Sequence, residues 1–310
     1  MVHARPSREK GDTARLSALH HERRTARFPH GRPAGIPYRP CPPPETDPLT
    51  QSPVVPRHPW ELPLLVAAVA VTLTIVVFAL HTLWTSLTDP QWPLLALLAL
   101  PAGFWAVRGL LHAEQRAQSI KISPTQFPEA HRVIRTLSAR MGLRSAPDAY
   151  VCHRGGRLSS AASGHGLRRY IVISSDLFEV GGRLRDPAAL TFVVAHQLGH
   201  IAAGHTSFWR RLGTSVAAVV PVLGASLSRA MEYTADDHAH AYCPEGAHAV
   251  QLLAGGKYLY PRINLGEMAD RARTERGPSL FLYNLFSHRP VNIKRMAAIR
   301  DRSSPGRVFL

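Results

Sequence analysis

The sequence is poor in cysteine and in acidic residues, and both shortages exclude classes of protein. Its 310 residues include 3 cysteines, which are far apart, odd in number and never in a C-x-x-C pair: Cys41, Cys152 and Cys243. A disulfide-stapled secreted module and a cysteine zinc ribbon are therefore excluded. Asp plus Glu is 21 against 37 for Lys plus Arg, which gives a formal net charge of +16. That excess raises the question of an anionic partner, either a nucleic acid or a membrane surface.

Residues 1–60 lack any sustained apolar period. They contain 12 of the 26 prolines and ten Lys/Arg against five Asp/Glu. Such a segment cannot bury enough apolar surface to offset its chain entropy, so we expect a disordered, basic, Pro-rich cytoplasmic tail. A binding role is an open alternative to a solvated tail near an anionic membrane.

Charge is missing from two long runs. No Lys, Arg, Asp or Glu occurs in the 27 residues between Glu61 and Asp89, or in the 18 residues of 90–107. Because about 20 apolar residues cross a bilayer core about 30 Å thick, region 61–112 is predicted to form two transmembrane helices, at about 62–83 and 91–111. A cleaved signal is disfavoured, since the first run starts some 60 residues into the chain and is too long. Two buried helices of a soluble core are the other alternative.

Basic residues flank this predicted hairpin on both sides. The tail precedes it, and Arg108, Arg116 and Lys121 follow. By the positive-inside rule, an integral protein of the cell membrane is expected, with its N- and C-terminal parts in the cytoplasm. The lipid bilayer then accounts for much of the net charge. No nucleic-acid partner is expected, because the sequence shows neither an aromatic-basic platform nor a helix-turn-helix signal.

Residues 113–310 are predicted to form the soluble domain, which is α+β, mainly helical, with a small sheet. Its first elements are predicted to be an amphipathic helix at 127–141 and short strands at 149–152 and 170–173. Segment 212–228 has no charged residue but contains Pro221 and is short for a membrane span. We expect a buried or interfacial helix there, with membrane insertion as the alternative.

One predicted helix carries two histidines a turn apart. Asp186 and Pro187 are typical of a helix start and Gly204 of a stop, and the helix between them contains HQLGH at 196–200. Histidines at i and i+4 share one helix face and can reach one metal ion. In a chain with 17 histidines, this pair alone favours two ordinary histidines.

A second predicted helix supplies acids with the same spacing, at Glu232 and Asp236. With His196 and His200, Glu232 would complete a His₂Glu set for one zinc ion, with a fourth position open to water. Asp236 would accept a hydrogen bond from the outer nitrogen of a ligating histidine and fix its tautomer. The alternative is that both acids are solvated charges on a helix face.

The arrangement of motifs resembles the membrane-anchored zinc metallopeptidases of the HtpX, Oma and CAAX prenyl protease type, peptidase family M48. The resemblance covers about residues 120–300. The matching pieces are, in chain order, a small-residue turn at 159–164, an edge strand at 170–178, HQLGH in place of HExxH, the E-x-x-x-D helix at 232–236, and Ser-His-Arg-Pro at 287–290 with Arg295 behind it. The resemblance implies a zincin-type (gluzincin) domain and protein or peptide substrates. It also implies that His288 stabilises the oxyanion and that Arg295 orders the site.

Gln197 stands where this family has its general base. A glutamine is neutral and has no useful basicity near pH 7, although it can hold a water molecule by hydrogen bonds. Loss of general acid–base catalysis costs about 10²–10⁴ in rate, or about 3–5 kcal/mol of transition-state stabilisation. Zinc binding should persist because Gln197 is not a ligand. Glu to Gln is the minimal change, so natural loss and an engineered trap are both open.

No other base is evident in the sequence. His205 follows the second histidine by five residues, on another face, and Ala203 and Thr206 do not fit the metzincin pattern. We interpret His205 as a structural residue, with a proton relay as the alternative.

Two functions follow. The first is a membrane-bound zinc endopeptidase that hydrolyses protein substrates at the cytoplasmic face, with the substrate added as a strand at 170–174. The second is a pseudopeptidase that binds zinc and peptides or partner proteins without cutting them. Gln197 favours the pseudopeptidase, because a glutamine cannot act as the general base.

Overall fold

A computed structural model describes residues 53–86, 91–153, 160–178 and 186–309. The described residues all belong to one compact unit. The predicted tail therefore lies outside the described residues up to residue 52, as do the link at 87–90 and the first residue of the predicted turn, Ser159.

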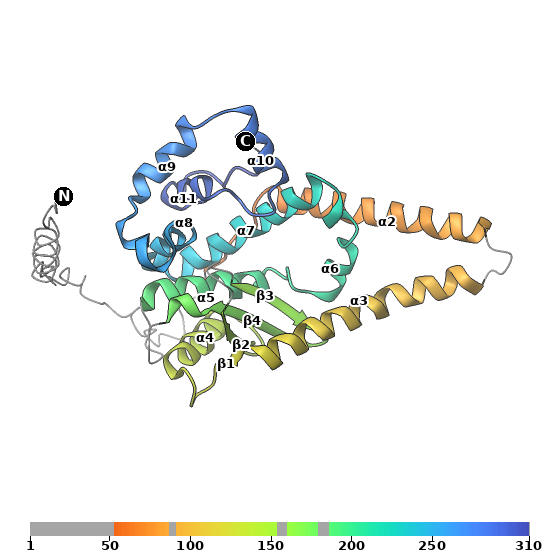
Figure 1. Ribbon diagram of the computed structural model, residues 1–310, viewed down its shortest axis with the longest axis horizontal. Coiled ribbons are helices and arrows are strands. Elements are labelled where there is room, and N and C mark those ends of the chain that lie inside the picture. Colours follow the sequence, from red (N-terminus) through yellow and green to blue (C-terminus); the bar gives the residue numbers. More distant parts are fainter. Residues whose placement is uncertain (1–52, 87–90, 154–159, 179–185, 310) are drawn as a thin grey trace, which may run out of the picture. The chain divides into compact units, whose positions relative to one another are not determined.

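Two long apolar helices open the described chain, α2 (Glu61–Ser86) and α3 (Gln91–Gln118) (Figure 1). Both are long and apolar enough to cross a membrane by length and composition. Only 17% and 6% of their most apolar stretches are buried in the described structure. Side chains such as Phe78 and Leu98 are more than half exposed.

The sheet has four strands in the order β1-β2-β4-β3. Their bounds are β1 Ile120–Lys121, β2 Asp148–Cys152, β3 Ala161–His165 and β4 Arg168–Ser174. β2 and β4 are parallel, with Val151 opposite Ile173, and the other two pairs are antiparallel. The two predicted short strands are confirmed.

The predicted edge strand at 170–174 is wrong in its position, because β4 lies inside the sheet and β3 lies at the edge. The predicted small-residue turn is largely this strand β3, which pairs with β4 through Ala162 and Ile171. The true turn is Gly166 and Leu167, with Gly166 at φ +57°. Alanine, serine and glycine give no apolar alternation, so the pairing partner rather than the local sequence makes this segment a strand.

Helices cover both faces of the sheet. α4 (Pro128–Arg140) and α5 (Pro187–Ala202) pack on one face, where Ile171 and Ile173 join a core with Ile134 and Leu190. On the other face α3 contacts β2 and β3. Covering on both faces explains the unbroken apolar run of β4, which a half-solvated strand would not have.

The chain after α5 is helical. Its helices are α6 Phe208–Gly213, α7 Leu223–Tyr242, α8 Leu252–Leu259, α9 Leu265–Thr274, α10 Pro278–Phe286 and α11 Asn292–Arg300, with 3₁₀ helices at Ser175–Leu177, Ala217–Val219, Pro244–Gln251 and Tyr260–Arg262.

The single helix expected at 212–228 is not formed. α6 ends at Gly213, and α7 begins at Leu223 after a break that contains Pro221 and Val222, whose φ is +70°. Proline cannot donate the helical hydrogen bond, so the apolar segment is divided into short pieces.

Candidate metal centre

α5 begins and ends as its sequence predicts. The carboxylate of Asp186 accepts a hydrogen bond from the Ala189 N–H at 3.0 Å, and Pro187 is the first helical residue. At the other end Gly204 takes φ +75°. The apolar body of the helix is buried against the sheet, which fixes the direction in which the His196 face points.

α7 lies against α5 at a very short distance. A Cβ atom added at Gly199 would lie 2.7 Å from the His238 Cβ, so only a glycine fits between the two helices there. This close approach brings Glu232 of α7 to the two histidines of α5.

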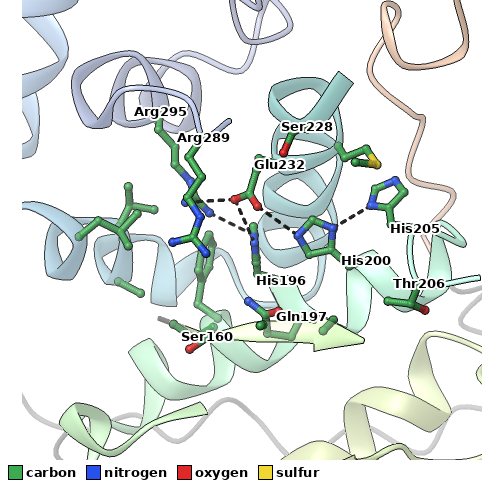
Figure 2. A pocket seen from close by; sticks show the side chains of 18 of the residues that line it. Ser160, His196, Gln197, His200, His205, Thr206, Ser228, Glu232, Arg289 and Arg295 are labelled. Atoms are coloured by element: carbon green, nitrogen blue, oxygen red, sulfur yellow. Dashed lines mark hydrogen bonds and ion pairs between the residues drawn. The ribbon is translucent and has the colours of Figure 1, made fainter. Parts of the chain in front are cut away.

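Three ligand atoms meet between the helices (Figure 2). The His196 Nε2 lies 3.6 Å from Glu232 Oε2, and the His200 Nε2 lies 3.6 Å from Glu232 Oε1. All three ligand atoms lie within 4.8 Å of one another. Ligands held tetrahedrally at about 2.0–2.2 Å from zinc lie about 3.3–3.6 Å apart, and the distance from each histidine nitrogen to its nearer Glu232 oxygen agrees with this spacing.

The outer nitrogen of His196 faces an acid. Its Nδ1 lies 2.8 Å from Asp236 Oδ1, and both groups are buried. Arg295 from α11 donates to the same carboxylate, with Nε 2.6 Å from Oδ2. The carboxylate therefore accepts from the His196 Nδ1–H, which leaves Nε2 as the free lone pair directed at the ligand group.

Electrostatics keep this group in ligand form. Burial lowers the pKa of His196, which favours the neutral imidazole that binds metals. Burial by itself would raise the pKa of Glu232, but the neighbouring His200 and the charge of Arg295 outweigh it and hold that pKa well below its usual range. Burial would also raise the pKa of Asp236, but the charge of Arg295 outweighs burial, so this pKa is lowered.

The outer nitrogen of the second histidine faces another histidine. The His200 Nδ1 lies 2.8 Å from the His205 Nδ1, and the His205 Nε2 lies 3.1 Å from Glu61 Oε1. Burial lowers the pKa of His205 to about 4, against the effect of Glu61, so its ring is neutral at pH 7. Sequence reasoning treated His205 as structural and used Glu61 only as the boundary of an apolar run.

A cavity of about 180 Å³ opens onto the ligand group. Its lining includes Ser160, Ala161, Ala162, His196, Gln197, His200, His205, Glu232, Arg289 and Arg295. The Gln197 side chain is buried, and its Oε1 accepts no hydrogen bond from the described residues. Glu232 is the one carboxylate in the described lining, and it belongs to the ligand group. Among the described lining residues, no second acid therefore lies beside Gln197 to act as base.

The segment 287–290 contributes a different residue from the expected one. His288 lines a neighbouring cavity of about 1130 Å³, whereas Arg289 lines both this cavity and the one at the ligand group. Figure 2 shows Arg289 beside Arg295, on the Glu232 side of the site. Nothing in the sequence indicated that Arg289, and not His288, would line the cavity at the ligand group.

The edge strand β3 borders the same cavity through Ala161 and Ala162. Arg108 of α3 fixes the strand's far end, because its Nε donates to the Gly164 carbonyl at 2.7 Å and its Nη2 donates to the Thr206 carbonyl at 3.0 Å. The unpaired side of an edge strand is a template for an added strand.

Comparison with known proteins gives one family. Residues 124–210 match the model of Peptidase family M48. The matched segment contains His196, Gln197 and His200, and Glu232 lies beyond it. No curated protein and no solved structure gives a match.

Proposed function

We propose, from the match of residues 124–210 to the model of Peptidase family M48, that the chain is a membrane-bound, HtpX-like zinc metalloendopeptidase whose turnover is impaired by Gln197. The observation that supports the metal is the orientation of the ligands. His196 and His200 both turn Nε2 toward Glu232, and both have a hydrogen-bonding partner at Nδ1.

His196, His200 and Glu232 would hold one zinc ion. When bound, the ion supplies Lewis acidity at the scissile carbonyl and lowers the pKa of water. Asp236 keeps the Nδ1–H of His196 in place, and Arg295 keeps Asp236 in place. Arg289 offers a cationic donor at the cavity, where charge on a carbonyl oxygen would need stabilisation.

The substrate class follows from the edge strand. An extended polypeptide that pairs with β3 would run along Ala161 and Ala162, beside the ligand group. Main-chain pairing selects extended chain rather than a particular side chain, so unfolded or misfolded proteins are the proposed substrates.

The proposed location is the membrane, through α2 and α3. The basic residues on both sides of region 61–112 favour a hairpin whose two ends lie in the cytoplasm, with the domain of residues 113–310 at the cytoplasmic face.

Gln197 determines how fast such a site can work. The amide cannot take a proton from water, and the described lining offers no acid besides the proposed ligand Glu232. The loss is about 10²–10⁴ in rate. The same residue favours the second candidate, a pseudopeptidase that holds zinc and binds peptides or partner proteins without cutting them.

The experiment compares the full chain with Gln197→Glu, both in detergent micelles, on an unfolded protein substrate with and without a zinc chelator. Gln118→Glu, an exposed glutamine of α3, is the matched control. Slow, chelator-sensitive cleavage by the parent and rapid cleavage by Gln197→Glu support the impaired peptidase. Cleavage by Gln197→Glu alone supports the pseudopeptidase. Absence of cleavage by both proteins, with no peptide binding, would contradict both candidates.

A further inference from the structure

Glu61 is a carboxylate with no exposed surface at the very start of α2. Three side chains satisfy it: His205 Nε2 at 3.1 Å, Arg210 Nη2 at 2.8 Å and the Thr234 hydroxyl at 2.5 Å. A buried carboxylate is costly unless it is fully partnered, so this cluster is a built arrangement rather than a chance contact.

The hydrogen bonds from Glu61 continue to a candidate metal ligand. A carboxylate only accepts, so the His205 Nε2 must carry a proton and donate it to Glu61. The proposed ligand atom of His200 is Nε2, so its Nδ1 carries the proton and donates to the bare Nδ1 of His205 at 2.8 Å. His200 is left with its lone pair on Nε2, which faces Glu232. One arrangement of protons satisfies all the hydrogen bonds between Glu61, His205 and His200. In this arrangement His200 has the tautomer that can bind a metal through Nε2.

The start of α2 is held firmly against the helix that carries Glu232. Leu64 and Ala68 of α2 share a buried cluster with Leu227 and Ala230 of α7. Just before α2, the His58 N–H donates to the Thr234 hydroxyl at 3.0 Å. Glu61 therefore has a fixed place relative to the site, which a positioning group needs.

We propose that Glu61 is a positioning residue for the metal centre: through His205 it fixes the ring orientation and tautomer of His200, and so connects the first membrane helix to the ligand group. The inference rests on the proposed function, because it assumes that His200 binds a metal. It goes further by assigning a role to the membrane helix itself. A chain whose α2 is displaced at its first turn would lose metal affinity.

A purely structural role for Glu61 makes a different prediction. In that case Glu61 would only join α2 to α6 and α7, and its removal would lower the stability of the metal-free protein and leave metal affinity unchanged. Affinity and stability must therefore be measured separately.

The test uses the full chain in detergent micelles, stripped of metal, and titrates Zn²⁺ in competition with a chromophoric chelator. The variants are Glu61→Gln, which keeps the size and removes the charge, and His205→Phe, which keeps a ring and removes the acceptor for His200. Glu114→Gln is the matched control, because it makes the same change at an exposed glutamate of α3. Thermal unfolding of each metal-free protein reports the structural part.

The expected result is a loss of Zn²⁺ affinity of about 10–100-fold for His205→Phe and about tenfold for Glu61→Gln, the range typical of groups that orient a metal-bound histidine. Glu114→Gln should keep the parent affinity. Parent affinity in Glu61→Gln would overturn the inference and leave the proposed metal site intact. If Glu61→Gln does not fold, His205→Phe decides, since Glu61 acts on His200 only through His205. A parent chain that binds no Zn²⁺ would instead overturn the proposed function.

Discussion

Arg295 binds Asp236 through two nitrogen atoms, with Nε 2.6 Å from Oδ2 and Nη2 2.6 Å from Oδ1. The pair is buried, and the same carboxylate faces the Nδ1 of His196. The planar fork of an arginine matches a carboxylate in a way that a lysine ammonium cannot. The orientation of the ligand His196 therefore depends on a residue from α11, near the end of the chain.

Arg295→Lys keeps the charge and removes the fork, so it should weaken Zn²⁺ affinity by about 10–100-fold. Chelator competition measures this. The matched control is Arg300→Lys, an exposed arginine of the same helix that pairs with Asp270 and should leave affinity unchanged. Equal affinity in Arg295→Lys and the parent would show that Asp236 needs no such support.

Gly199→Ala should separate α5 from α7, because the new Cβ would lie 2.7 Å from the His238 Cβ. Overpacking of this kind typically costs about 1–3 kcal/mol. We expect a lower melting temperature together with weaker Zn²⁺ binding, since Glu232 moves with α7. Gly213→Ala is the control, because its Cβ would make only an ordinary contact, 3.5 Å from Val69 Cγ2. A fully stable Gly199→Ala protein with unchanged affinity would contradict the close-approach argument.

The start of α5 should be stabilised in a limited pH range by the pair His248 and Asp186, whose nearest atoms are 2.7 Å apart. The hydrogen bond to Asp186 raises the pKa of His248 above 6.5, so its contribution is full below pH 6.5 and is lost as the pH rises through the raised value. Burial by itself would raise the pKa of Asp186, but the hydrogen bonds from His248 and the Ala189 N–H outweigh burial and lower this pKa below 3.8. That contribution is present above pH 3.8 and is lost as the pH falls through the lowered value.

His248→Gln should therefore lower the melting temperature most between pH 3.8 and 6.5, and progressively less as the pH rises above this range. Thermal unfolding of the parent and the variant across this range measures the difference. His131→Gln on α4 controls for loss of a histidine elsewhere. A difference that grows with pH would contradict the sign of the argument.

Peptide binding should depend on main-chain hydrogen bonds to β3. We expect an extended peptide to bind more tightly than the same peptide with alternate amides N-methylated, by about tenfold, because two lost hydrogen bonds of about 0.5–1.5 kcal/mol each are expected. Fluorescence anisotropy with labelled peptides measures this. Methylation of the other alternate set is the matched control, since those amides point away from the strand. Equal binding of all three peptides would rule out strand addition.

The parts of this account that the sequence predicted are those carried by local patterns. The limits of α5 follow from Asp186, Pro187 and Gly204, and the spacing of Glu232 and Asp236 places both acids on one face of α7. Helical periodicity and capping depend on neighbours a few residues away, so they can be read without the fold.

The remaining parts depend on distant pairings. β3 is a strand only because it pairs with β4, and its composition gives no sign of this. Glu61 and His205 are 144 residues apart and meet only because α2 packs on α7. Arg289 rather than His288 lines the ligand cavity because of how the segment between α10 and α11 is placed, which no local pattern encodes.

Elemental analysis of the purified chain shows whether His196, His200 and Glu232 hold zinc. The parent is compared with Glu232→Gln and with the control Asp237→Asn, which alters a neighbouring acid of α7 that pairs with Arg302. We expect one zinc ion per chain in the parent and in Asp237→Asn, and a large loss of zinc in Glu232→Gln. A parent chain that holds no zinc, and takes up none when it is supplied, would show that these three residues do not form a zinc site.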